Sequence, residues 1–428
     1  MKIAVLGLWH LGSVTAACLA EAGFATLGID FDAAVVARLR DGRAPLFEPG
    51  LDDLVAAGLA SGRLDFTTAP AAAAGCDIVW VAYDTPVDDD DRADPAAVTA
   101  AAARLFPHLS PGTVVLVSSQ LPVGSTRGLA AAFAAARPAI ACHFAYLPEN
   151  LRLGGALDAF RTTERIVVGR DDPAVEPVLR PVLEKFTGRI LWMSPESAEM
   201  TKHALNAFLA TSVAFANEVA GLCEGLGADA ADVERALRAE PRIGPRAYLK
   251  PGGAFAGGTL ARDVAFLNEL AARVALDTPL LASVLPSNRV QRDWPLRRLV
   301  QRLGDLRGHT VAVLGLAYKP GTDTLRRSAA LELCARLVGL GARVQAFDPA
   351  VRGLPPGHAD VALAAGAGAA LAGADAAVVA TEWPEFRALT AADCVAAMRR
   401  PLICDPNRFL AATLGGDARI DYLAVGLP

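Results

Sequence analysis

The chain has 428 residues, of which 53% are hydrophobic and 20% charged, and its formal net charge is −5 at pH 7. This length predicts two or three domains, and the slightly acidic balance gives no reason to expect nucleic acid or an anionic membrane as a partner. The seven cysteines are scattered without a CxxC pair, which argues against a disulfide framework or a zinc site. No long uncharged apolar run stands out and the chain opens directly on a strand-like segment, so we expect a cytoplasmic protein without a membrane span.

The segment that ends at Asp30 carries the most informative pattern. An apolar strand runs into Gly7, a turn follows, Gly12 opens an alanine-rich helix, and Asp30 ends a second apolar strand. This layout is typical of dinucleotide binding, because the glycines let the backbone approach a pyrophosphate and the helix N-terminus offers free N–H groups. An acid at Asp30 favours NAD over NADP. Trp9 stands where the middle glycine is usual, so a Rossmann-like unit that has lost its cofactor is the alternative.

The first half of the chain alternates strand-like and helical runs. The strands are expected at 2–8, 25–30, 77–83, 113–119, 139–148 and 165–169. Such alternation with short loops predicts a doubly wound parallel sheet. A helical pattern then starts at Pro195 or Ser197 and ends at Gly225 or Gly227. A helix of roughly 30 residues would be about 45 Å long and would bridge domains or pack against a partner subunit.

A second α/β unit begins near position 309. Its opening "TVAVLGLAYKP" repeats the "AVLGL" of the N-terminal "KIAVLGLWHLG", and further strands are expected at 343–349, 375–383 and 401–407. The Arg-rich, amphipathic segment 285–308 links the two halves. The sequence therefore predicts an α/β fold with two Rossmann-like, doubly wound parallel-sheet domains joined by a long central helix.

Ten segments in order give the chain a resemblance over essentially its whole length. They are "GLWHLGSVTAACLAEAG", "PLFEPGL", "DTPVDDDDRAD", "LPVGST", "PENLRLGGALD", "EMTKHALNAFLATSVAFANEVAGLCE", "RIG", "GGAFAGGTLARDV", "VLGLAYKPGTDTLRRS" and "FDP". With these segments the chain resembles the UDP-glucose/GDP-mannose dehydrogenase family. The resemblance implies an NAD-binding Rossmann domain over 1–195, a central helical dimerisation region with an active-site loop over 196–295, and a UDP- or nucleotide-sugar-binding domain over 296–428.

The family implies a two-step chemistry. Its members oxidise the primary alcohol of a nucleotide-linked hexose to a carboxylate and reduce two NAD⁺. A family cysteine captures the intermediate aldehyde as a thiohemiacetal, a second hydride leaves, and water cleaves the thioester. The adduct is needed because a free aldehyde lacks a good hydride to donate, whereas a tetrahedral adduct has one.

Several residues match the family's machinery. Lys202 and Asn206 lie one helical turn apart and so project from one face; in the family they hold the substrate oxygen and stabilise the oxyanion. A solvated lysine on a polar helix face is the alternative for Lys202. The resemblance also implies that Glu149 and Asp263 handle water or its proton. It further assigns substrate contacts to Arg242, Phe255 and Lys319, and cofactor contacts to Gly7, Trp9, Leu11, Gly12, Asp30, Thr85, Gln120, Arg262 and Arg326, with Asp323 beside Arg326.

Other positions depart from the family pattern. Thr259 stands at the position of the catalytic cysteine, and a threonine hydroxyl is a far poorer nucleophile than a thiolate at neutral pH. Arg262 replaces a lysine, which keeps the charge but changes its geometry. Gln120 replaces a threonine, and Asn150 replaces a phenylalanine. These changes cluster at the expected active site, whereas Lys202, Asn206, Glu149 and Asp263 are retained.

The sequence therefore favours an enzyme with altered chemistry. We expect NAD-dependent oxidation of a UDP-glucose-like nucleotide sugar at its primary alcohol toward the uronic acid, by a route without the thiohemiacetal cysteine. One alternative is a single two-electron oxidation, or redox-neutral epimerisation on retained NAD. Another is a non-catalytic protein that binds a nucleotide sugar and NAD. We expect a homodimer through the central helix, with no metal, nucleic acid or membrane as partner.

Overall fold

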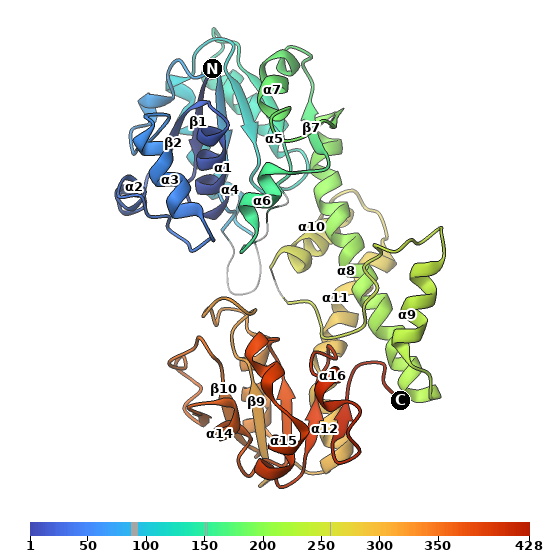
Figure 1. Ribbon diagram of the computed structural model, residues 1–428. Helices are drawn as coiled ribbons and strands as arrows, with labels where there is room; N and C mark the ends of the chain where they lie inside the picture. The colour runs from blue at the N-terminus through green and yellow to red at the C-terminus, as the bar shows by residue number, and fades with distance from the viewer. Residues whose placement is uncertain (87–92, 150, 152, 257) are drawn as a thin grey trace. The chain divides into compact units, whose positions relative to one another are not determined.

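The computed structural model describes residues 1–86, 93–149, 151, 153–256 and 258–428. Asn150 and the middle of the "DTPVDDDDRAD" segment lie outside the described residues. The chain divides into two compact units, Met1–Leu205 and Asn206–Pro428 (Figure 1), and we describe each by itself.

The first unit contains an eight-stranded sheet in the order β3-β2-β1-β4-β5-β6-β7-β8. Its inner strands are short and mostly apolar, as expected for strands covered on both faces; β1, for example, buries Ile3, Ala4, Val5 and Leu6 completely. The strands are β1 (Lys2–Leu6), β2 (Ala25–Ile29), β3 (Leu64–Thr67), β4 (Ile78–Val81), β5 (Val114–Val117), β6 (His143–Tyr146), β7 (Ile166–Arg170) and β8 (Ile190–Met193).

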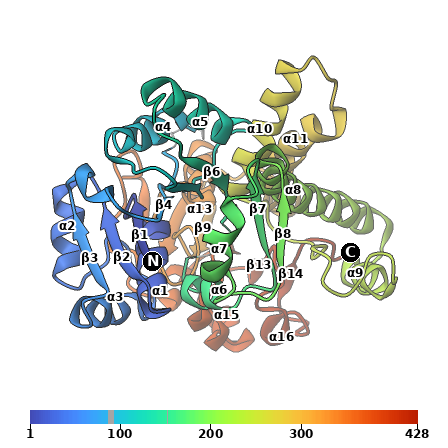
Figure 2. The same ribbon diagram turned by 90° about the horizontal axis from the view of Figure 1, so that it is seen from above.

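Helices cover both faces of this sheet (Figure 2). One hydrophobic core gathers Leu19 of α1, Val55 of α3 and Leu179 of α7 on one face. A second core places Val98 of α4 and Leu129 of α5 on the other. The helices are α1 (His10–Glu21), α2 (Ala33–Arg40), α3 (Leu51–Ala60), α4 (Pro95–Ala103), α5 (Ser125–Ala136), α6 (Ala156–Arg161) and α7 (Val175–Leu183).

The second unit contains a six-stranded, wholly parallel sheet in the order β11-β10-β9-β12-β13-β14. Both sheets therefore use the 3-2-1-4-5-6 order of a doubly wound fold, to which the first sheet adds two strands. The strands are β9 (Thr310–Leu314), β10 (Arg343–Phe347), β11 (Val361–Leu363), β12 (Ala376–Val379), β13 (Leu402–Cys404) and β14 (Asp421–Leu423). The helices wholly within this unit are α9 (Ala230–Ala239), α10 (Thr259–Arg273), α11 (Pro279–Arg292), α12 (Trp294–Leu303), α13 (Ala329–Gly339), α14 (Ala367–Leu371), α15 (Ala391–Ala397) and α16 (Ala411–Leu414).

Two details differ from the sequence-based expectation. Strand β7 runs antiparallel to β6, so the first sheet is not wholly parallel. A continuous apolar run such as "RIVVG" indicates a buried strand but carries no signal for its direction. The structure also adds β3, β8, β11 and β14, which are the four edge strands of the two sheets.

The two sheets repeat one local geometry. Gly7 and Gly315 both have positive φ, 88° and 90°, and each donates to the last residue of the neighbouring strand, Ile29 or Phe347. The next amides, of Leu8 and Leu316, donate at 2.7 Å to Asp30 and Asp348 respectively. The shared "AVLGL" thus marks a structural repeat of the Rossmann-like unit.

Helix α8 (Pro195–Leu226) joins the two units, and its bounds confirm the predicted long helix. The hydroxyl of Ser194 accepts the amide N–H of Ser197 at 3.2 Å, so a serine N-cap and Pro195 at the first helical position fix where α8 begins. Along the helix, Ala198 joins the core of the first sheet, Ala210 a small core with α10 and α11, and Cys223 the core of the second sheet.

Helix α8 is also long and apolar enough to cross a membrane by length and composition, and 44% of its most apolar window is buried within the protein. Core helices of soluble proteins meet the same criterion, so one such helix is weak grounds for a span. The expected absence of a membrane partner stays a prediction.

Candidate active site

The glycine turn after β1 has the backbone geometry that a dinucleotide requires. A Cβ on Gly12 would lie 1.6 Å from the main-chain oxygen of Gly7, so only glycine lets α1 pack this closely on the turn. Trp9 has φ −72°, which any residue adopts, and the exposed fraction of Trp9 is 47%. Because the backbone at Trp9 does not need a glycine, the imperfect motif still forms the turn.

The first turn of α1 already faces an acid. The amide N–H of Leu11 donates to the carboxylate of Asp84 at 3.3 Å. Asp84 follows β4 and is exposed, whereas Leu11 is buried. Free N–H groups at a helix N-terminus are the groups that bind a pyrophosphate, so Asp84 places a negative charge beside a position suited to an anionic ligand.

Asp30 lies at the end of β2, as the sequence predicted. Its carboxylate accepts one amide on each oxygen, from Leu8 at 2.7 Å and from Asp32 at 2.9 Å. Each carboxylate oxygen has two lone pairs, so both retain capacity for a ribose hydroxyl. Nearby, burial and the charge of Asp30 raise the pKa of the Tyr83 hydroxyl, so Tyr83 stays protonated. The turn, α1 and Asp30 together fit an NAD-type dinucleotide.

Residues that follow β4 and β5 lie at the same carboxyl edge of the sheet. The hydroxyl of Thr85 donates to the main-chain oxygen of Gln120 at 2.7 Å, and both residues are buried. This bond joins the two loops on which the sequence analysis placed cofactor contacts. Ligands bind at this edge in doubly wound sheets, where the strand order reverses.

Lys202 and Glu149 meet beside a cavity in the first unit. The Lys202 ammonium lies 2.5 Å from the main-chain oxygen of Glu149 and 3.6 Å from its carboxylate. The cavity has about 860 Å³ of empty space, including space open to solvent. Besides these two residues, its lining includes Trp80, Phe160 and Phe186. A cation and a carboxylate against an apolar wall can orient a hydroxyl and direct its proton.

In the second unit, Asn206 of α8 donates its side-chain amide to the carboxylate of Asp263 on α10. Both side chains are buried. Thr259 is the first residue of α10 and lies one turn before Asp263, but it is exposed. Arg262, between them, is half-buried. The structure therefore brings Asn206 and Asp263 together as a hydrogen-bonded pair.

The predicted substrate contacts differ in how firmly the structure holds them. Arg242 is 88% exposed and pairs with Glu240 at 2.7 Å. Phe255 is held on both backbone groups by the side-chain amide of Asn288. Lys319 follows β9 and is half-buried, and Asp323 and Arg326 lie exposed in the segment after it.

Sequence reasoning missed a set of residues that hold the segment before α10. Asn217 accepts the amide of Gly252 at 2.8 Å, and Asn407 accepts the amide of Gly253 at 2.7 Å. The side chain of Gln291 donates to the main-chain oxygen of Gly252 at 2.7 Å. Asn217 and Gln291 lie on helices and Asn407 lies in a turn, and no local pattern reveals these contacts because the partners are distant along the chain.

Sequence reasoning also missed two buried glutamates. Glu48 accepts the amides of Gly154 and Ala156 at 2.7 and 2.9 Å, and its carboxylate lies 2.9 Å from His10. Glu199 accepts donors at the start of α5. Each caps a helix from a remote part of the chain, which no local pattern reveals.

Family models match along the chain. The NAD binding domain of the UDP-glucose/GDP-mannose dehydrogenase family matches residues 1–187, its central domain 196–290, and its UDP binding domain 312–412. The chain is 34% identical to UDP-glucose 6-dehydrogenase of Pseudomonas aeruginosa, over 100% of this chain and 98% of that protein. It is 34% identical to UDP-glucose 6-dehydrogenase YwqF of Bacillus subtilis, with the same coverage of both chains.

Solved structures give the same picture. A UDP-glucose dehydrogenase from Pyrobaculum islandicum superposes with a TM-score of 0.86 at 33% identity, covering 100% of this chain and 97% of that one. A UDP-D-ManNAc dehydrogenase from Pyrococcus horikoshii superposes with a TM-score of 0.86 at 25% identity, covering 100% and 99%.

Proposed function

The chain belongs to the UDP-glucose/GDP-mannose dehydrogenase family, and on that premise we propose that it oxidises the primary alcohol of a UDP-glucose-like nucleotide sugar toward the uronic acid without a catalytic thiol. The observation that carries the proposal is the contact of the buried Lys202 ammonium with the half-buried Glu149, beside the cavity in the NAD-binding domain. NAD⁺, when bound, supplies the acceptor for the hydride. Asp30 favours NAD over NADP, because its carboxylate would repel a 2′-phosphate.

The protein's own groups would act on the reacting oxygen. The Lys202 ammonium and the Asn206 amide, one turn apart on α8, would donate to the substrate oxygen, which becomes an alkoxide as its proton passes to water and an aldehyde oxygen as the hydride leaves. Glu149 directs a water, and its neighbour Lys202 compensates the charge. Asp263, held by Asn206, takes a proton from water. We assign cofactor contacts to the residues around the glycine turn and the β4 and β5 loops, and substrate contacts to Arg242, Phe255 and Lys319.

The route at the aldehyde stage would differ from that of the family. We propose that Thr259 stands where the family has its cysteine, and that water adds to the aldehyde instead. The resulting hydrate carries the C–H bond from which a second hydride would leave to a second NAD⁺, and loss of both hydroxyl protons gives the carboxylate. Consistent with this route, burial raises the pKa of six thiols, which keeps them protonated: Cys18, Cys76, Cys142, Cys334, Cys394 and Cys404.

We also propose that the chain forms a homodimer through α8. Phe208, Phe215 and Leu222 are 68%, 51% and 65% exposed and recur every seven residues, so they share one face of the helix. Leu226, one turn further, is 83% exposed. An apolar stripe of this length on a soluble enzyme is typical of a subunit interface.

The decisive experiment measures NADH formed per mole of nucleotide sugar, over a panel of UDP- and GDP-linked hexoses and with NAD⁺ or NADP⁺. Two NADH per sugar, with NAD⁺ preferred, supports the proposal. One NADH with a carbonyl product indicates a single oxidation. This is the second candidate function, because position 259 carries a threonine and no thiol. An epimerised sugar without NADH indicates redox-neutral chemistry, and tight binding without turnover indicates a binding protein.

A further inference from the structure

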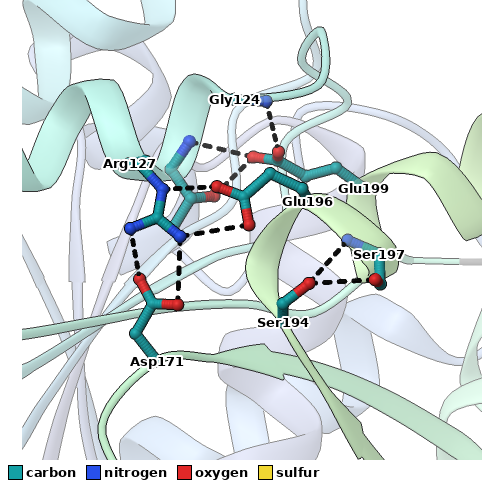
Figure 3. Close-up of polar contacts among 8 residues, drawn as sticks. Gly124, Arg127, Asp171, Ser194, Glu196, Ser197 and Glu199 are labelled. Carbon is teal, nitrogen blue, oxygen red and sulfur yellow. Dashed lines mark hydrogen bonds and ion pairs between the residues drawn. The ribbon is translucent and has the colours of Figure 1, made fainter.

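Helix α5 is capped by an acid from a distant part of the chain. The carboxylate of Glu199, on α8, accepts the amide N–H of Gly124 at 2.6 Å, the amide of Thr126 at 2.9 Å and the Thr126 hydroxyl at 2.7 Å. Gly124 itself, the N-cap residue of α5, offers no side chain. Figure 3 shows Glu199 pointing from α8 to the start of α5.

This cap is deeply buried. Glu199 is 0% exposed, and burial raises the pKa of its carboxyl although the bonds from Thr126 and Gly124 lower it. A buried carboxylate is costly unless donors and a helix N-terminus compensate it. A local serine or aspartate would cap α5 alone. The remote glutamate does more, because it ties α8 to the loop between β5 and α5.

The same turns of α8 make two further contacts. His203 lies 2.9 Å from the main-chain oxygen of Leu121, in the loop that Glu199 caps, and its ring nitrogen must donate because a carbonyl only accepts. Lys202 donates to the main-chain oxygen of Glu149, after β6. Glu199, Lys202 and His203 thus fix the beginning of α8 to two loops at the carboxyl edge of the sheet.

A neighbouring glutamate offers a contrast. Glu196, one turn before Glu199, pairs with Arg127, which also contacts Asp171 (Figure 3). The side chains of Arg127, Glu196 and Asp171 are 56%, 35% and 52% exposed. Glu196 thus joins the same two helices, α8 and α5, through an exposed ion pair. Exposed ion pairs contribute little to stability.

We propose that Glu199 is a positioning residue for Lys202: by capping α5 from α8, it sets where the Lys202 ammonium lies relative to Glu149 and the loop that carries Gln120. This inference rests on the proposed function only for its kinetic part. Glu199 would act through Lys202 rather than by contact with the substrate.

The first test does not depend on turnover. The chain has five lysines, Lys2, Lys185, Lys202, Lys250 and Lys319, so a protein labelled with 13C at the lysine ε-carbon gives few NMR signals, and the Lys202 signal is the one lost in Lys202→Ala. We expect Glu199→Gln to shift this signal, because an amide cannot accept all the donors that the carboxylate accepts. Glu196→Gln is the matched control and should leave it in place. An unshifted Lys202 signal in a folded Glu199→Gln protein overturns the proposal.

The second test is a double-mutant cycle on kcat. Glu199→Gln should lower kcat at least about tenfold in the wild-type background and less than about twofold in Lys202→Ala, because its effect passes through Lys202. Glu196→Gln should change kcat less than about twofold in either background. Additive losses would show that Glu199 is only structural. If the wild-type protein forms no NADH with any nucleotide sugar, the proposed function fails, and the NMR shift alone decides the role of Glu199.

Discussion

Lys202 and Glu149 form a partly buried contact in which the ammonium lies closer to the main-chain oxygen, at 2.5 Å, than to the carboxylate, at 3.6 Å. The exposed fraction of the Lys202 side chain is 4% and that of Glu149 is 22%. The cation is therefore held by the backbone, and the carboxylate keeps access to the cavity. A solvated surface lysine does not fit this environment.

We therefore expect Lys202→Ala to lower turnover at least about a hundredfold and to leave the NAD dissociation constant nearly unchanged, because the charge is needed mainly in the transition state. Steady-state kinetics and a fluorescence titration with NAD measure the two effects. Lys185→Ala, at an exposed lysine, is the control. Near-normal turnover in Lys202→Ala would contradict the assignment.

Asp84 should weaken cofactor binding. Its carboxylate faces the Leu11 amide at the start of α1, where a pyrophosphate would add like charge. Asp84→Asn should tighten NAD binding several-fold, and the gain should shrink as salt is raised because exposed charges are screened. Calorimetric titration at two salt concentrations tests this. Equal affinity of both proteins at low salt would show that Asp84 moves aside without cost.

Glu48 should make folding stability depend on pH in the acid range. Burial alone would raise its pKa, but the amides of Gly154 and Ala156 and the side chain of His10 outweigh it, so the pKa lies below the ordinary value. A carboxyl group whose pKa is lower in the folded than in the unfolded protein stabilises the fold at pH values above its unfolded-state pKa. This stabilisation is lost as the pH falls through the folded-state pKa.

The free energy of unfolding of Glu48→Gln should thus lie below that of the wild type near neutrality, and the difference should shrink as the pH falls below about 4. Urea unfolding at several pH values gives the comparison. Glu184→Gln, at an exposed glutamate, should show no such trend. If the difference in unfolding free energy between the two proteins does not change with pH, the packing of the Glu48 side chain rather than its charge stabilises the fold.

Thr259 should not act as a nucleophile, because an alkoxide scarcely forms at neutral pH without a dedicated base. Thr259→Ala should keep most of the activity, and no covalent substrate adduct should appear in intact-protein mass spectra during turnover. Thr259→Cys should raise full oxidation if the surrounding geometry is that of the family. A wild-type adduct that disappears in Thr259→Ala would instead make Thr259 the nucleophile.

The exposed apolar stripe of Phe208, Phe215 and Leu222 on α8 should be buried between the two subunits of a dimer. Phe215→Arg places a charge at its centre and should convert a particle of twice the chain mass into a monomer, as measured by light scattering at micromolar concentration. Leu340→Arg is the control, since Leu340 is exposed beyond the end of α13. A wild-type monomer would exclude this interface.

The sequence predicted the inner strands, the glycine turn, Asp30 and the bounds of α8, because each has a local signature. It missed β3, β8, β11 and β14, which as edge strands are short and only partly buried; β8 is apolar throughout, but a run of four residues is too short to distinguish a strand by its period. It also missed the direction of β7. The remote caps from Glu48 and Glu199 depend on residues more than seventy positions away, and no motif encodes such partners.

The repeat of the Rossmann-like unit differs at one carboxylate. Asp348 accepts five donors, the amides of Leu316, Ala317, Ala350 and Val351 and the indole of Trp383. Its oxygens are filled, so this position cannot hold a ribose as Asp30 can.

Of the two glycine turns that the structure describes, the one that follows β9 thus lacks the free carboxylate oxygens that suit the first to NAD. A substrate that loses two hydrides must remain at the aldehyde level while spent NADH leaves and fresh NAD⁺ arrives. The fraction of aldehyde that escapes therefore depends on how fast the aldehyde dissociates relative to cofactor exchange. A higher NAD⁺ concentration lowers that fraction and raises the yield of acid.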